Sequence, residues 1–152
     1  MERRLITEEF VTRSVMKLLK DCGWDIISFD LPEMGTGTVL HKNGTSGKNK
    51  ECIIPDVFAY KNGGLLFCES KDFFSEDDVD KMMDLKNGLY NDSISKRLRK
   101  LKWKNTWVSI AYPKLKSTGK EDYKDVDFTF LVELVDIHIN CLNTDYNNKL
   151  FN

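Results

Sequence analysis

The chain has 152 residues, of which 41% are hydrophobic and 31% are charged. These values are typical of one globular domain with its own hydrophobic core, so we expect residues 1–152 to form a single domain. The net charge is −1, which excludes an overall basic field. Any attraction to nucleic acid must therefore come from a local patch of positive charge.

The sequence gives no sign of export or of a membrane segment. Its start, MERRLITEEF, lacks the apolar stretch of a secretory signal, and no run approaches the length of a membrane span. The four cysteines include no CxxC pair, and the two histidines are not spaced to complete a zinc site. We therefore expect reduced thiols, a cytoplasmic location and no membrane partner.

The first third of the chain predicts a helix, a strand and a long loop. Thr7 is a suitable N-cap for a helix over 8–22, and Gly23 is a suitable stop. The run 24–31 has the composition of a strand. Residues 33–50 contain four glycines and few apolar groups, which predicts a mobile or substrate-contacting loop, with a short strand at 38–41.

The middle of the chain predicts a hairpin followed by a helix. Strands over 52–60 and 65–72 flank an Asn-Gly-Gly turn at 62–64. A capping-box-like start at Ser75 and Asp78 opens a helix that we expect to reach about Tyr90.

The last third predicts further strands and a frayed end. The basic segment 92–104 precedes a buried strand over 106–112, and 127–140 forms one long strand or two short ones. The polar tail 143–152 is expected to fray. This order of elements predicts an α/β fold in which a central mixed β-sheet is flanked by helices.

Two short patterns in the hairpin carry the functional signal. Pro55-Asp56 lies in the first predicted hairpin strand, and Glu69-Ser70-Lys71 ends the second. Because side chains alternate along a strand, Glu69 and Lys71 share a face, and the turn brings Asp56 beside them. Converging carboxylates favour a hard cation with oxygen ligands, namely Mg²⁺ with Mn²⁺ as a substitute, one or two ions in number. The backbone carbonyl of Ser70 is a further candidate ligand.

Each pattern taken alone has an ordinary structural explanation. A Pro-Asp pair is common at turns, and a Glu-x-Lys at a strand end is often an exposed ion pair. Together they resemble the PD-(D/E)XK nuclease superfamily, which includes many restriction endonucleases and junction resolvases. The resemblance covers about residues 5–112. It implies an αβββαβ restriction-endonuclease-like core and metal-dependent cleavage of nucleic acid, with Asp56 and Glu69 as metal ligands and Lys71 as the catalytic lysine.

Many members of that superfamily also carry a glutamate on the first helix. On a helical projection Glu8 lies near the apolar face, whereas Glu9 points to solvent. Glu8 is therefore the candidate fourth catalytic residue and a weaker metal ligand. It lies one turn earlier than the resolvase-like pattern, in which Thr12 takes the corresponding position.

Basic residues in two segments are candidates for contact with nucleic acid. The ordinary alternative for the segment 96–104 is a solvated helix face, and His41 and His138 are expected to be structural. The candidates for phosphate contact are Lys96, Arg97, Arg99, Lys100, Lys42, Lys48 and Lys50.

The leading hypothesis is a Mg²⁺-dependent DNA endonuclease of restriction type. A compact domain with one site cuts one strand, so double-strand cleavage calls for a homodimer. The alternatives are a structure-specific nuclease, such as a resolvase or a viral replication and repair enzyme, and an RNA endonuclease. From another class, a non-catalytic nucleic-acid-binding module of the same fold also remains open.

Overall fold

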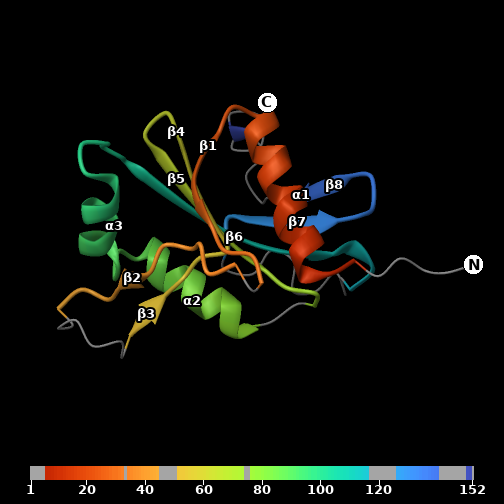
Figure 1. Cartoon of the computed structure of the whole chain (residues 1–152), viewed down its shortest axis with the longest axis horizontal. Helices are drawn as coiled ribbons and strands as arrows, with labels where there is room; N and C mark the ends of the chain where they lie inside the picture. The colour runs from red at the N-terminus through yellow and green to blue at the C-terminus, as the bar shows by residue number, and fades with distance from the viewer. Residues whose placement is uncertain are drawn as a thin grey trace, which may run out of the picture.

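The computed structural model describes residues 6–32, 34–44, 51–73, 76–116, 126–140 and 150–151. Three helices and eight strands are defined within these ranges (Figure 1). In chain order they are α1 (Glu8–Asp21), β1 (Asp25–Phe29), β2 (Leu40–His41), β3 (Cys52–Ile53), β4 (Val57–Lys61), β5 (Gly64–Ser70), α2 (Glu76–Lys86), α3 (Asn91–Leu98), β6 (Asn105–Pro113), a 3-10 turn (Lys114–Lys116), β7 (Phe128–Val132) and β8 (Ile137–Asn140).

A six-stranded mixed sheet forms the centre of the fold, as the sequence predicts. Its order is β1-β4-β5-β6-β7-β8. Strands β1, β4 and β5 are antiparallel neighbours, β5, β6 and β7 run parallel, and β8 returns antiparallel to β7. The parallel step from β5 to β6 needs a long crossover, which is the segment that contains α2 and α3.

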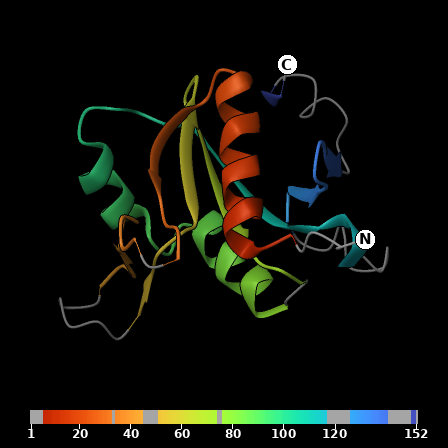
Figure 2. The same cartoon turned by 45° about the vertical axis from the view of Figure 1, so that its right-hand side comes forward.

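The helices cover opposite faces of this sheet (Figure 2). Alternate residues of β5 separate the two cores, because Leu66 and Cys68 pack with α1 whereas Leu65 and Phe67 pack with α2 and α3. Every residue of β5 is buried, as expected for a central strand covered on both sides. In the described part of the chain, no helix has the length and apolar character needed to cross a bilayer.

The start of α1 confirms the predicted cap. The backbone N–H of Phe10 donates to the Thr7 hydroxyl at 3.1 Å, which satisfies one of the free amides of the first turn. The helix ends at Asp21, and Gly23 follows with φ of 85°. Glycine adopts this left-handed conformation without steric cost, so it stops the helix at the predicted place.

The predicted strand over 52–60 is wrong in one respect, because the chain breaks between β3 and β4. Pro55 lies in this break and has no N–H to donate to a ladder. The segment before the break pairs elsewhere: Cys52 and Ile53 bond to His41 and Leu40 in a separate two-stranded sheet. The short strand expected at 38–41 is thus present as β2.

The predicted helix over 75–90 is also shorter than expected. Helix α2 ends at Lys86, and Gly88 with φ of 87° turns the chain into α3. The basic segment 92–104 is therefore half helix. Ser75, the predicted cap, lies outside the described residues, as do residues 33 and 45–50 of the predicted loop.

The predicted frayed tail is wrong for its last described residues. Phe151 is buried, and its ring lies 4.9 Å from that of Phe128 and 5.7 Å from that of Phe130. The indole N–H of Trp24 donates to the Leu150 carbonyl at 2.6 Å. The contacts of one buried aromatic side chain stabilise this end of the chain, although the residues around it are polar.

We expect Phe151→Ala to destabilise the protein by about 3 kcal/mol, because truncating a buried phenylalanine removes apolar burial and leaves a cavity. Chemical denaturation followed by circular dichroism measures this change. Leu115→Ala is the matched control, since Leu115 is 91% exposed and should cost little. Equal stability of the two variants would show that the terminal contacts add nothing.

Candidate metal centre

The hairpin β4–β5 brings Asp56 and Glu69 together. Val57 pairs with Cys68 across the two strands, so the residues immediately outside this pair, Asp56 and Glu69, lie side by side. The backbone N–H of Ser70 donates to the Asp56 carboxylate at 2.7 Å. Both acidic residues are more than nine-tenths buried, with 8% and 9% of their surfaces exposed. The sequence prediction that these two carboxylates converge is thus matched by the geometry.

Burial of two adjacent carboxyl groups changes how they bind protons. Desolvation, then the charge of Asp56, raises the pKa of Glu69 to about 9. Desolvation also raises the pKa of Asp56 to about 6, against the opposing effect of the Ser70 hydrogen bond. The two side chains share a hydrogen bond, in which Glu69, the weaker acid, holds the proton. In the metal-free protein the pair therefore carries about one negative charge at neutral pH.

One oxygen of this pair has no partner. Within the described residues, Glu69 Oε2 is fully buried and makes no hydrogen bond. A buried polar atom without a partner costs on the order of 1–3 kcal/mol, so such atoms usually have a ligand or a functional reason. A hard divalent cation accepts oxygen ligands of this kind. The residues present therefore fit a Mg²⁺ or Mn²⁺ ion.

Lys71 lies at the edge of the same site. Its backbone N–H donates to the Ala111 carbonyl at 2.9 Å, which anchors it just beyond the end of β5. The side chain is half-buried and lines one small pocket with Glu69 and Asp78. Burial alone would lower the pKa of the Lys71 ammonium, but four surrounding carboxylates raise it above its ordinary value. The amine therefore stays charged in the metal-free protein.

Glu8 approaches this site from the other face of the sheet. It begins α1, whose N-terminal end lies at the same end of the sheet as α2 (Figure 2). Burial raises the pKa of its carboxyl, the charge of Lys71 opposes this, and Asp72, Asp78 and Asp30 add to it. Glu8 does not form a trio with Asp56 and Glu69 in which all ligand atoms lie within 4.8 Å. The structure thus places it near the pair but not against it.

Two further acidic residues belong to this site, and the sequence interpretation missed both. Asp78 is 4% exposed on the inner face of α2. The sequence predicts Asp78 only as part of a helix cap, although its spacing to Met82 and Leu85, both buried, is that of the inward face. Asp30 follows β1, and its N–H donates to the Asp56 carbonyl at 2.9 Å. No local pattern distinguishes Asp30, since only the pairing of β1 with β4 brings it here.

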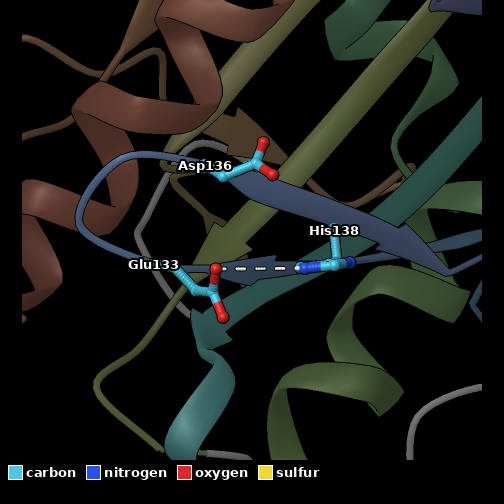
Figure 3. Close-up of side chains that lie close together, drawn as sticks. All are labelled: Glu133, Asp136 and His138. Carbon is cyan, nitrogen blue, oxygen red and sulfur yellow. Dashed lines mark ion pairs between the residues drawn. The ribbon is translucent and has the colours of Figure 1, made fainter.

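A second acidic group lies on the β7–β8 hairpin (Figure 3). Ligand atoms of Glu133, Asp136 and His138 all lie within 4.8 Å of one another. Lys114 already contacts this group, because its amine lies 3.0 Å from the His138 ring and 3.3 Å from the Glu133 carboxylate. Glu133 also pairs with His138 at 3.9 Å. Glu133 is half-buried, Asp136 and His138 are exposed, and the Lys114 ammonium already lies among them. The group is therefore a surface ion-pair network.

The residues predicted to contact phosphate differ in their exposure and in their bonding to the rest of the protein. Lys96, Arg99 and Lys100 are exposed, whereas the Arg97 guanidinium donates to the Ile27 carbonyl at 3.2 Å and to the Thr38 hydroxyl at 3.3 Å. Arg97 thus holds α3 against β1. Lys42 pairs with Glu51 at 3.5 Å.

The end of the basic segment that leads into β6 lies away from the carboxylate pair. After α3 the chain reaches β6, whose first residue, Asn105, pairs with Gly64 at the start of β5. Glu69 is near the other end of this seven-residue strand, so the two ends are about 20 Å apart at a rise of about 3.3 Å per residue. The remaining candidates, Lys48 and Lys50, lie outside the described residues.

Comparisons with protein-family models, with curated proteins and with solved structures give no match for this chain. The functional argument therefore depends on the geometry of the carboxylate pair and its surroundings.

Proposed function

We propose that the protein is a Mg²⁺-dependent endonuclease of the PD-(D/E)XK type that cleaves DNA. The observation that carries this proposal is the buried pair Asp56 and Glu69, with one Glu69 oxygen lacking a partner and the Lys71 side chain lining the same pocket as Glu69. A buried carboxylate oxygen without a hydrogen bond is unusual where two carboxyl groups serve a purely structural purpose.

The order of elements supports the proposal. Read as α1, β1, β4, β5, α2 and β6, the chain follows the αβββαβ sequence expected of a restriction-endonuclease-like core. In this reading the small β2–β3 sheet and α3 are additions, and β7 and β8 extend the sheet beyond β6. In this reading Asp56 and Glu69 lie at the adjoining ends of the second and third strands of the core.

The proposed mechanism assigns a role to each side chain. Asp56 and Glu69 would hold the metal, with the Ser70 carbonyl as a further oxygen donor, and Glu8 would lie outside direct ligand distance of it. The metal supplies Lewis-acid chemistry, which acidifies water and offsets charge on a phosphate. The Ser70 N–H donates a hydrogen bond to the Asp56 carboxylate and thereby fixes the orientation of that carboxylate. The Lys71 ammonium donates hydrogen bonds to a phosphate oxygen and orients the attacking water.

The test is a cleavage assay with a panel of substrates: duplex DNA, a four-way junction, single-stranded DNA and RNA, each with Mg²⁺, Mn²⁺ or EDTA. We expect metal-dependent products from DNA and none from Asp56→Ala. The double variant Glu133→Ala with Asp136→Ala is the matched control, because it removes two carboxylates from the surface network and should cut like the wild type.

The pattern of products decides between the alternatives. Defined double-strand breaks in plain duplex indicate a restriction-type homodimer, and cleavage of the junction alone indicates a structure-specific nuclease. Cleavage of RNA alone would redirect the substrate assignment. Binding without cleavage of any substrate in Mg²⁺ or Mn²⁺ would identify a non-catalytic binding module and refute the proposal.

We expect the triple variant Lys96→Ala, Arg99→Ala, Lys100→Ala to bind DNA with a weaker salt dependence. Each lost phosphate contact reduces the slope of log K against log salt by about 0.9 for duplex DNA. Fluorescence anisotropy across a salt series without divalent metal measures this slope. Arg97→Ala is the control within the same segment: its guanidinium is engaged by the protein, so it should lower stability by about 1 kcal/mol and leave the slope unchanged. An unaltered slope in the triple variant would show that these three side chains are solvated and do not contact phosphate.

A further inference from the structure

An exposed aromatic side chain lies beside the carboxylate pair. Phe73 has 57% of its surface exposed, whereas every other aromatic side chain in the described part of the chain is buried or half-buried. Phe73 lines the same small pocket as Glu69, Lys71 and Asp78. Leu115 is more exposed, at 91%, but it does not line this pocket. The exposed ring is therefore a feature of the candidate metal centre.

The path of the chain limits how far this ring lies from the reacting groups. Lys71 is anchored just beyond β5 by its hydrogen bond to the Ala111 carbonyl, and Phe73 follows two residues later. Two residues of chain span at most about 7 Å. Successive nucleotides along one strand of a duplex are about 3.4 Å apart. A strand whose phosphate lies beside Glu69 and Lys71 therefore brings its nearest bases within reach of the Phe73 ring.

The charges around the ring favour contact with a base over contact with further phosphates. Of the described residues that line the pocket, Lys71 is the only cation, whereas Glu69 and Asp78 are acidic. Asp72, between Lys71 and Phe73, is exposed. Affinity for phosphate comes from neutralisation by cations, so this end of the sheet attracts a nucleic-acid backbone weakly. A planar apolar ring adds affinity that does not depend on charge.

An exposed ring distinguishes unpaired bases from paired ones. In an intact duplex the faces of each base are covered by its stacked neighbours, so the bases present only their edges in the grooves. An aromatic side chain can stack on a base only where that base has left the stack or has lost a neighbour. Flaps, bulges, junctions and single-stranded ends offer such bases, whereas plain duplex does not.

From these features we infer that Phe73 stacks on an unpaired base next to the phosphate at the metal centre. The preferred substrate then has a single-stranded nucleotide at the cut. This inference rests on the proposed function, because the metal centre determines which phosphate the stacked base adjoins. It assigns substrate selection to Phe73 and leaves the chemistry to Asp56, Glu69 and Lys71. An intact duplex would first have to unstack at the cut, which costs free energy.

The test removes the stack from the protein and from the nucleic acid in turn. Fluorescence anisotropy measures binding of the full chain to a single-stranded DNA in Ca²⁺, and a gel verifies that the strand stays intact. A second strand has the same backbone but abasic sites in place of its bases. We expect the wild type to bind the strand with bases about 5- to 150-fold more tightly, the range for one base–aromatic stack. Phe73→Ala should lose this preference.

Further variants separate stacking from general apolar contact. Phe73→Trp retains a ring and should keep the preference, whereas Phe73→Leu retains only apolar surface and should lose it. Leu115→Ala is the matched control at an exposed residue outside the pocket, and it should bind both strands as the wild type does. None of these variants removes a charge, so the slope of log K against log salt should not change. Circular dichroism verifies that each variant is folded.

Cleavage of matched substrates completes the test. In Mg²⁺ the wild type should cut a duplex with a single-stranded flap at least about fivefold faster than the intact duplex of the same sequence. Phe73→Ala should bring this ratio close to one. A base preference that survives in Phe73→Ala, or equal cleavage of both substrates by the wild type, overturns the inference and leaves the proposed function standing. Base-dependent binding through Phe73 without cleavage of any substrate refutes the proposed function and supports the stacking contact alone.

Discussion

Glu69→Gln should make the metal-free protein more stable at alkaline pH while removing its response to Mg²⁺. A glutamine has the shape of the protonated glutamate and donates a hydrogen bond to Asp56 as that form does, but it carries no proton to lose. The wild type has to keep Glu69 protonated or bury a second charge beside Asp56. The substitution removes this cost together with the charge that a cation needs.

The direction in which stability changes with pH follows from the number of protons bound by the native and the unfolded protein. The unfolded chain releases the Glu69 proton near its ordinary pKa of 4.5, whereas the native protein holds it until about pH 9. Between these values the native state binds more protons, so wild-type stability falls as pH rises. Glu69→Gln should remove most of this fall. We expect a gain on the order of 2–4 kcal/mol at pH 8.5, with little difference near pH 5.

Thermal unfolding at both pH values, with and without Mg²⁺, measures these effects. For a domain of this size, 2–4 kcal/mol corresponds to an increase in Tm of about 5–10 °C. Mg²⁺ at a hundred times its Kd should stabilise the wild type by about 2.7 kcal/mol at pH 8.5 and leave Glu69→Gln unchanged. Glu133→Gln is the control, because that carboxylate is partly exposed and already paired with Lys114. A variant less stable than the wild type at pH 8.5 would show that the buried carboxyl is not destabilising.

Lys71→Ala should reduce cleavage by about a thousandfold, within the range of roughly 10²–10⁴ for loss of a positioned proton-transfer or charge-stabilising group. Metal binding should persist, because Asp56 and Glu69 remain. Removing one positive charge from among four carboxylates should even strengthen the Mg²⁺-induced rise in Tm. Single-turnover kinetics at saturating protein measures the chemical step apart from substrate binding.

Lys81→Ala is the matched control for this prediction. Lys81 also acts on the charge of Glu69, but its side chain is exposed on α2 and does not line the pocket. We expect its rate to stay within a few-fold of the wild type. Similar losses in both variants would mean that Lys71 acts only through the general charge of the site. An active Lys71→Ala would remove it from the catalytic assignment.

The parts of the fold that were predictable from sequence are those with a local cause. Thr7 and Gly23 define the ends of α1, and the Asn62–Gly64 turn defines the hairpin, because capping and turn geometry depend on neighbouring residues. The convergence of Asp56 and Glu69 follows from that turn and from strand alternation. These features need no knowledge of the rest of the chain.

The parts that could not be predicted depend on contacts between distant segments. Proline has no N–H to donate to a strand ladder, so an interruption at Pro55 is compatible with the sequence. The pairing of β3 with β2 has no such local signal. Asp30 and Asp78 reach the site through the β1–β4 pairing and the packing of α2. Phe151 docks through contacts with residues more than twenty positions away. Arg97 looked like a phosphate ligand by composition and is held instead by a backbone carbonyl of β1.

The length of β5 bears on how much nucleic acid the protein would need. The carboxylate pair lies near one end of this strand, and Lys104, the last residue of the basic segment, lies at the other, about 20 Å away. Successive base pairs of a duplex are about 3.4 Å apart. A substrate that reaches both ends therefore spans about six base pairs to one side of the cut. If the protein is the nuclease proposed above, oligonucleotides shorter than this would not reach Lys104 when bound at the carboxylate pair.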